Sequence, residues 1–215
     1  MTAVQNAPAE ERVEGRGTLP PALLAQALTA VLPHSALEKD NLPPITGVRF
    51  DTPEDGKITL AATDRFTVGS WTMDWDGGHV DAFLPLQSAK ELLAYAKSCP
   101  KTMGAHAGMA LTFGHDVLEV FDFTRRSQLP VASPEHFPSW RSLLPDYTGG
   151  LPDGIQYAGV NPTHFAKFGK AVERGIPLTL TFGGSPLKPI RVDTGEHFVG
   201  LLMPVRLASM PWDRG

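Results

Sequence analysis

Apolar residues along the chain follow a helical spacing in some segments and a strand-like alternation in others. Helical spacing marks three segments, residues 19–32, 88–98 and 161–174. Each is followed by short apolar runs that end at Gly, Pro, Asn or Asp, which is typical of strands. The three segments recur at intervals of roughly 70 residues, and a repeat of that size indicates a supersecondary unit that occurs three times.

The strand-like runs indicate the fold class. We expect strands at residues 45–52, 57–63, 66–75, 80–86, 109–113, 117–123, 127–133, 155–160, 178–182, 189–193 and 198–207. Most connections between them are short hairpins, which favour antiparallel sheets with helices on one face. The sequence therefore predicts an α+β fold.

Turn and capping residues suggest where helices begin and where domains end. Thr18 is expected to cap the first helix, Ser88 with Glu91 to form a capping box on the second, and Asn161 to cap the third. We expect a disordered tail at 1–18, a domain of two half-units at 19–147, a half domain at 148–208 and a second tail at 209–215.

Composition narrows the class of protein. The chain has 215 residues, 42% of them hydrophobic and 20% charged, as in an ordinary globular protein. Its single cysteine, Cys99, excludes an intramolecular disulfide and a cysteine-based zinc site, and suits a reducing cytoplasm. No apolar run is long enough for a membrane helix. The net charge of −4 still allows a locally basic face.

Basic residues form rows on two of the predicted helices. The third helix has apolar residues on one side and, displaced by roughly 200°, Lys167, Lys170 and Arg174. The second helix carries Lys90 and Lys97. Such rows are either solvated surface or sites of weak, salt-dependent and sequence-independent attraction to DNA phosphates. Because the first helix has no basic residue, any DNA-facing surface would be incomplete.

Four segments, in this order, resemble the bacterial DNA polymerase III β subunit, the β sliding clamp. They are Ile45-Thr-Gly-Val-Arg-Phe50, Leu60-Ala-Ala-Thr-Asp-Arg-Phe66, residues 136–145 and Leu202-Met-Pro-Val-Arg-Leu207. The resemblance covers roughly residues 19–207 and implies a DNA-clamp-like fold of three half-units. The family has three domains of two half-units each, so this chain would keep the middle domain and the second half of the last one.

The resemblance also implies a pocket that receives short peptides from DNA polymerases and the clamp loader. Its wall in this chain would be Thr63, Arg65, Phe66, Val68, Pro145, Leu202, Met203, Pro204 and Arg206. An apolar groove with polar edges suits the anchor side chains of an extended peptide. Without the resemblance, the alternating apolar members of this set would be read as core.

Two classes of function follow, and neither needs a cofactor or a metal. No nucleophile–base pair or phosphate-loop motif occurs, although a hydrolase built from scattered Asp and His stays open. The first hypothesis is a non-catalytic replication or repair factor that binds double-stranded DNA and tethers partners through the pocket. The second is a clamp mimic that binds clamp-partner peptides or a host clamp without encircling DNA.

The predicted assembly follows from the odd third half-unit. Such a unit would leave an unpaired sheet edge and an apolar helix flank. We expect it to pair with its copy in a second chain, so that the protein is a homo-oligomer, a dimer or a tetramer, with residues 209–215 as an alternative cover for the edge.

Overall fold

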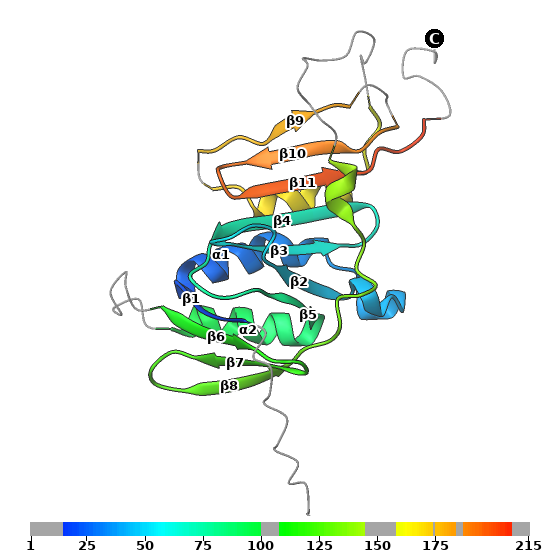
Figure 1. The fold of residues 1–215 in the computed structure, drawn as a ribbon. Coiled ribbons are helices and arrows are strands. Elements are labelled where there is room, and N and C mark those ends of the chain that lie inside the picture. The colour runs from blue at the N-terminus through cyan, green and yellow to red at the C-terminus, as the bar shows by residue number, and fades with distance from the viewer. Residues whose placement is uncertain (1–14, 100–107, 145–157, 174, 184–186, 208–215) are drawn as a thin grey trace, which may run out of the picture.

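The computed structural model describes residues 15–99, 108–144, 158–173, 175–183 and 187–207 (Figure 1). Every strand pair among these residues is antiparallel, and helices are mixed with the strands. The predicted α+β class is confirmed.

The elements follow one another in three blocks. The first block contains β1 (Gly15–Leu19), α1 (Pro21–Val31), β2 (Gly47–Asp51), β3 (Lys57–Thr63) and β4 (Thr67–Asp74), with the 3-10 turns η1 (Leu32–His34), η2 (Glu38–Asp40) and η3 (Pro43–Ile45) before β2. The second contains β5 (Asp81–Pro85), α2 (Leu86–Ser98), β6 (Met109–Phe113), β7 (Val117–Phe121), β8 (Arg126–Pro130) and η4 (Trp140–Leu143). The third contains α3 (Pro162–Phe165), η5 (Ala166–Lys170), β9 (Thr179–Thr181), β10 (Ile190–Thr194) and β11 (Phe198–Leu202). The count of three half-units stays an interpretation of these blocks.

The first two blocks exchange strands. One sheet has the order β1-β6-β7-β8 and the other β5-β2-β3-β4-β11-β10-β9. The strand before each helix therefore pairs with the other block: β1 joins β6, and β5 joins β2. The third block extends the larger sheet beyond β4, as Figure 1 shows.

The core lies where α1 and α2 meet the sheets. The two helices contact each other; α1 also contacts β3 and β4, and α2 contacts β2, β5 and β8. On α1, Leu24, Leu28 and Val31 are buried at helical spacing. On α2, Ala89 and Leu92 are buried in the same way. The apolar stripes read from the sequence are thus the faces that pack.

Two glycines make the contact between the first and third blocks possible. Gly69 of β4 lies opposite Gly200 of β11. A Cβ on Gly69 would lie 2.3 Å from the His34 ring, and one on Gly200 would lie 2.5 Å from the Phe168 ring. These two rings pack with their centroids 4.7 Å apart. Only residues without a side chain let both rings approach the paired strands this closely.

The expected tail at 1–18 is too long, because residues 15–18 belong to β1. The strand alternates between buried and exposed positions, but two of its buried positions are Gly15 and Gly17, which an apolar pattern does not detect. A Cβ on Gly15 would lie 2.4 Å from the carbonyl oxygen of His79. Thr18 is accordingly in a strand and not a helix cap; its amide donates to Asp76 Oδ1 at 2.6 Å.

The capping box predicted on the second helix is also wrong. α2 begins at Leu86 with Pro85 at the N-cap position, and Ser88 is buried within the helix. The side chain of Glu91 instead accepts a hydrogen bond from Gln87 Nε2 at 2.8 Å. A helix that follows a strand directly has its start set by the packing of the strand, which a local capping pattern does not reveal.

The third predicted helix is shorter than expected. Asn161 does cap it, since its Oδ1 accepts from the Thr163 amide at 2.9 Å. However, α3 covers one turn, continues as the 3-10 helix η5 and ends at Lys170. Gly169 within this stretch weakens a regular α-helix.

Most strand predictions agree with the structure to within a few residues. β3 and β6 have the predicted bounds, whereas the last strand ends at Leu202 and not at residue 207. Of the strand expected at 155–160, only the last three residues are described, and Gly159 forms an isolated bridge with Val205. The expected boundary between the domains at 19–147 and 148–208 and the tail at 209–215 lie outside the described residues.

Candidate functional site

The two segments predicted to build the peptide pocket lie side by side. β4 and β11 pair antiparallel, with Leu202 opposite Thr67 and Leu201 opposite Val68. Beyond the last paired residues, the Met203 amide donates to the Phe66 carbonyl oxygen at 2.9 Å. Segments more than 130 positions apart in the sequence thus form one surface at the end of the sheet.

The predicted pocket wall contains both buried and exposed side chains. Thr63, Val68 and Leu202 are buried, Pro204 is half-buried, and Arg65, Phe66, Met203 and Arg206 are exposed. Pro145 lies outside the described residues. The exposed members are the ones able to touch a partner directly, and the buried ones hold the strands that present them.

Phe66 is held in place although half of its side chain is exposed. The preceding residue, Arg65, has a positive φ of 77°, so the chain turns sharply between β3 and β4. Asp64 Oδ1 accepts from the amides of Phe66 and Thr67, at 3.0 and 2.7 Å. The Phe66 ring stacks on His164 of α3 with 4.9 Å between centroids. The turn therefore offers a fixed aromatic face.

Asp64 also joins this turn to the third block. Its Oδ2 lies 2.5 Å from Lys167 Nζ and 3.7 Å from His164 Nδ1. Burial favours the protonated acid, but the hydrogen bonds from Lys167 and Thr67 outweigh it, so the pKa of the Asp64 carboxyl lies below its usual value. Nothing in the local sequence indicated this pair, because its members are 103 positions apart.

A buried histidine lies beside this ion pair. His34 is fully buried, and neither ring nitrogen has a hydrogen-bond partner among the described residues. Burial, assisted by the Lys167 charge and opposed by Asp64, lowers the pKa of His34 to about 3. The imidazole is thus neutral and acts as a packing group against Phe168.

The predicted basic row is only partly available to a ligand. Lys90, Lys97 and Lys170 are exposed, whereas the Lys167 side chain is only 20% exposed and pairs with Asp64. Arg174 lies outside the described residues. Of the predicted row, two lysines of α2 and one of η5 are therefore exposed among the described residues.

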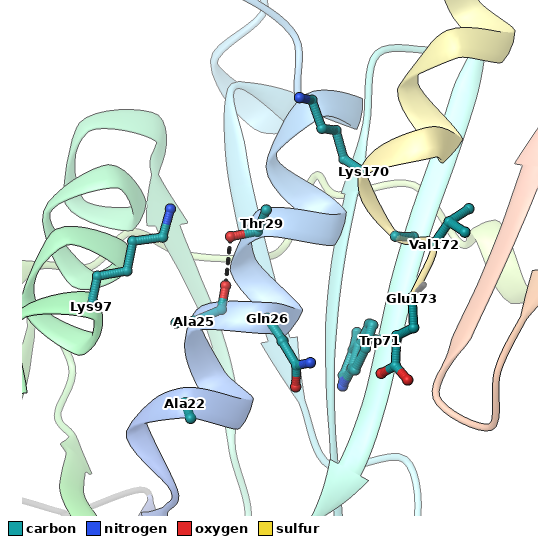
Figure 2. Close-up of a pocket in the computed structure, with 10 residues that line it drawn as sticks. Ala22, Ala25, Gln26, Thr29, Trp71, Lys97, Lys170, Val172 and Glu173 are labelled. Carbon is teal, nitrogen blue, oxygen red and sulfur yellow. Dashed lines mark hydrogen bonds between the residues drawn. The ribbon is translucent and has the colours of Figure 1, made fainter. Parts of the chain in front are cut away.

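Two of these lysines border one groove of about 510 Å³. Figure 2 shows α1 between Lys97 on one side and Lys170 on the other. α1 contributes small side chains to the groove, among them Ala22 and Ala25, and β4 contributes Trp71. α1, which has no basic residue, therefore lines the groove between Lys97 of α2 and Lys170 of η5.

Neither a cluster of metal ligands nor a membrane-spanning helix is found among the described residues. In the part of the chain that the structure covers, no three His, Cys, Asp or Glu side chains gather closely enough to hold a metal ion. No helix in the same part combines the length and apolarity that a membrane crossing needs.

The comparisons with known proteins concern the fold. No family model matches the chain, and no curated protein does. The DNA polymerase III β subunit of Thermotoga maritima is similar in structure, with a TM-score of 0.75 and 13% identity over 95% of this chain and 68% of that one. Two structures of the DNA polymerase sliding clamp of Pseudomonas aeruginosa, one with ligand, give TM-scores of 0.70 and 0.71 at 10% identity, over 96% and 95% of this chain and 70% of theirs. The chain has the sliding-clamp fold, and the resemblance read from the sequence is confirmed at that level.

Proposed function

We propose that this chain is a sliding-clamp-like accessory factor of DNA replication or repair, without catalysis of its own, which works in the cytoplasm. It binds duplex DNA without sequence specificity and holds partner proteins through short peptides. The observation that supports this most is the junction of β4 with β11, where Phe66 and Met203 share a hydrogen bond within a sliding-clamp fold. Holding a partner near DNA raises its effective concentration, and no bond is made or broken.

The peptide site in this proposal is the surface formed by Phe66, Met203 and Arg206, with Arg65 at its edge. The aromatic face of Phe66 is fixed by its stacking on His164 and needs no ordering when a peptide binds. An exposed methionine adapts to varied apolar anchors. Arg65 and Arg206 can form charge-assisted hydrogen bonds with an acidic residue at one end of an extended peptide.

The DNA site in this proposal consists of Lys90, Lys97 and Lys170, and includes Arg174 as the sequence predicts. Phosphate contacts from the three lysines alone would make affinity fall roughly 40-fold between about 50 and 200 mM salt. Lys167 belongs to the predicted row but its charge is paired with Asp64, so we assign it to the junction.

Two binding measurements test the proposal. A labelled peptide from a bacterial clamp partner should lose at least about tenfold in affinity with Phe66→Ala, because an exposed aromatic anchor is removed. Phe123→Ala is the matched control, since Phe123 is 64% exposed and lies in the β7–β8 turn.

The second measurement is the fluorescence anisotropy of labelled duplex DNA, which should show salt-dependent binding. The triple variant Lys90→Glu, Lys97→Glu and Lys170→Glu should abolish this binding. Lys39→Glu, in η2, should leave DNA binding unchanged.

A second candidate function is the clamp mimic that never encircles DNA. The ion pair of Lys167 with Asp64 favours it, because it leaves the third block with Lys170 as its exposed helical cation among the described residues. Peptide binding that depends on Phe66, together with no salt-dependent DNA binding by the unmodified protein, would select this candidate over the first.

A further inference from the structure

The turn between β7 and β8 exposes two phenylalanines. Phe121 and Phe123 are 37% and 64% exposed, and Phe123 is the most exposed large hydrophobic residue among those that the structure describes. Their ring centroids lie 5.7 Å apart, with 53° between the ring planes. Neither ring belongs to the core, so the packing of the fold gives no reason for aromatic residues at these positions.

The backbone at Phe123 is strained. Its φ of 70° lies in the left-handed region, which residues with bulky side chains rarely adopt. Asp122, which is 2% exposed, holds this conformation, because its Oδ1 accepts from the amides of Thr124 and Arg125 at 3.1 and 3.0 Å. Stability alone would select glycine at position 123. A strained backbone that carries an exposed aromatic side chain is typical of a functional position.

The turn is fastened to α2 and is therefore rigid. Tyr95 Oη donates to the Arg125 carbonyl oxygen at 2.7 Å, and Arg125 Nη2 donates to the Tyr95 carbonyl oxygen at 3.0 Å. The guanidinium carbon of Arg125 lies 3.9 Å from the centroid of the Tyr95 ring. Its Nε forms an ion pair with Asp122 Oδ2 at 3.1 Å. A partner that binds the two phenylalanines would thus lose little affinity to the ordering of the turn.

One arginine beside the rings is available to an anion. Arg126 is exposed and lies directly opposite Phe121 in the pairing of β7 with β8, so the two side chains share one face of the smaller sheet. No carboxylate of the described residues forms an ion pair with Arg126. Glu119, on the same face, accepts from Gln128 Nε2 at 2.9 Å. Phe121, Phe123 and Arg126 together form what we call the turn surface.

We propose that the turn surface binds single-stranded DNA, with bases stacked on the two phenylalanine rings and a backbone phosphate paired with Arg126. Exposed rings beside a cation suit a single strand of any sequence, because every base has a face that can stack. A guanidinium can hold a phosphate with two hydrogen bonds. An apolar peptide anchor would instead need a pocket, and neither ring lines the groove along α1 or the apolar pocket bordered by Leu42 and Phe83.

The turn surface lies close to the proposed duplex site. Arg125 Nη2 donates to Ser98 Oγ, so the turn contacts the end of α2 that carries Lys97. A single strand that extends from a duplex bound at Lys97 can therefore continue onto the turn surface. The inference extends the proposed function to single strands, but it does not depend on the duplex site, since a short single strand needs only the turn surface.

The binding of short single strands tests the proposal. The probe is a labelled oligothymidylate of about eight nucleotides, compared with an abasic strand of the same length, which has the phosphates but no bases. The unmodified protein should bind the oligothymidylate at least about tenfold more tightly, because only its bases stack. The double variant Phe121→Leu and Phe123→Leu should remove this difference, since leucine is apolar but has no aromatic face. Leu143→Ala, at an exposed apolar residue of η4, is the control and should change nothing.

Three single variants separate stacking, charge and backbone strain. Phe123→Trp should keep the binding of oligothymidylate. Arg126→Gln should reduce the slope of log affinity against log salt by about 0.7, as expected for one phosphate contact on a single strand, whereas Lys39→Gln should leave it unchanged. Phe123→Gly should weaken binding without lowering the melting temperature, because glycine adopts a φ of 70° freely.

Equal affinity for the oligothymidylate and the abasic strand would overturn the proposal, and so would unchanged binding by the double leucine variant. Binding of the two rings to anionic lipid vesicles or to a clamp-partner peptide, but not to oligothymidylate, would overturn it as well. Blunt duplex DNA and the peptide are measured on the same samples. Loss of duplex binding or of Phe66-dependent peptide binding would count against the proposed function, and ring-dependent binding of oligothymidylate would still support this inference.

Discussion

Asp64 and Lys167 form an ion pair with 2.5 Å between Oδ2 and Nζ, and this pair joins the first block to the third. The two side chains are only 12% and 20% exposed, so water screens them weakly. One of the lysines that the sequence assigns to DNA binding thus has a structural partner. Removal of the Lys167 side chain should therefore reduce the stability of the fold more than it reduces the affinity for a ligand.

Lys167→Met should lower the free energy of unfolding by about 1 to 3 kcal/mol, because it leaves a partly buried carboxylate without its counter-charge. Urea denaturation of Lys167→Met, Asp64→Asn and the double variant should give a coupling energy that favours the pair. Lys57→Met is the control: Lys57 and Asp74 are also 2.5 Å apart but well exposed, and this change should have no measurable effect. Equal losses for the two lysine variants would contradict the role given to Lys167.

The lysines should differ in their effect on DNA binding. Lys97→Gln and Lys170→Gln should each reduce the salt dependence of DNA affinity by about one counterion, because both side chains are exposed beside the groove along α1. Lys167→Gln should leave the slope unchanged under conditions in which the variant is folded. A loss of slope for Lys167→Gln as large as for Lys170→Gln would mean that Lys167 leaves Asp64 to contact DNA.

His34 should make the protein sensitive to acid. Its pKa is about 3 in the folded chain and near 6.5 when unfolded, so the unfolded state binds the proton first. The stability contributed by the neutral ring is complete above pH 6.5 and is lost as the pH falls towards 3, with a slope of at most about 1.4 kcal/mol per pH unit. Unfolding curves of His34→Phe should lack this loss between about pH 6.5 and 4. His115→Phe, at a highly exposed histidine, should keep it.

The paired glycines of the junction should not tolerate a methyl group. Gly69→Ala and Gly200→Ala should each lower the free energy of unfolding by about 1 to 3 kcal/mol, since the new Cβ overlaps a buried ring in both cases. Gly169→Ala should be neutral or stabilising, because a Cβ at that position would have no atom within 4 Å apart from its chain neighbours and the backbone of its own helix. Thermal unfolding distinguishes the three variants, and similar melting temperatures for all of them would show that the rings move aside easily.

The sequence predicted correctly those elements whose bounds are set by interactions between residues close together in the chain. β3 and β6 have the expected bounds because apolar alternation and turn residues delimit both. The cap at Asn161 was correct because its hydrogen bond to Thr163 lies within the same turn. The start of β1 was missed because glycines at 15 and 17 occupy its buried positions, where close approach of another backbone replaces side-chain packing.

The two segments of the candidate site could be predicted from the sequence, but their arrangement in space could not. The motifs around Phe66 and Met203 were found in the sequence, and their adjacency depends on the pairing of β4 with β11. The charge on Lys167 looked available because helical spacing places it beside Lys170, yet its partner Asp64 comes from a distant turn. The burial of His34 has no sequence signal, since a lone histidine after a helix has the same appearance whether it is buried or exposed.

The pairing of β4 with β11 has a consequence for biosynthesis. Ser70 Oγ donates to the Val199 carbonyl oxygen at 2.6 Å, and 129 positions separate the two residues. A ribosome therefore completes β4 long before it makes the strand that covers its edge. During that interval the nascent chain exposes an incomplete sheet, which is a state that invites chaperone binding or aggregation until translation reaches β11.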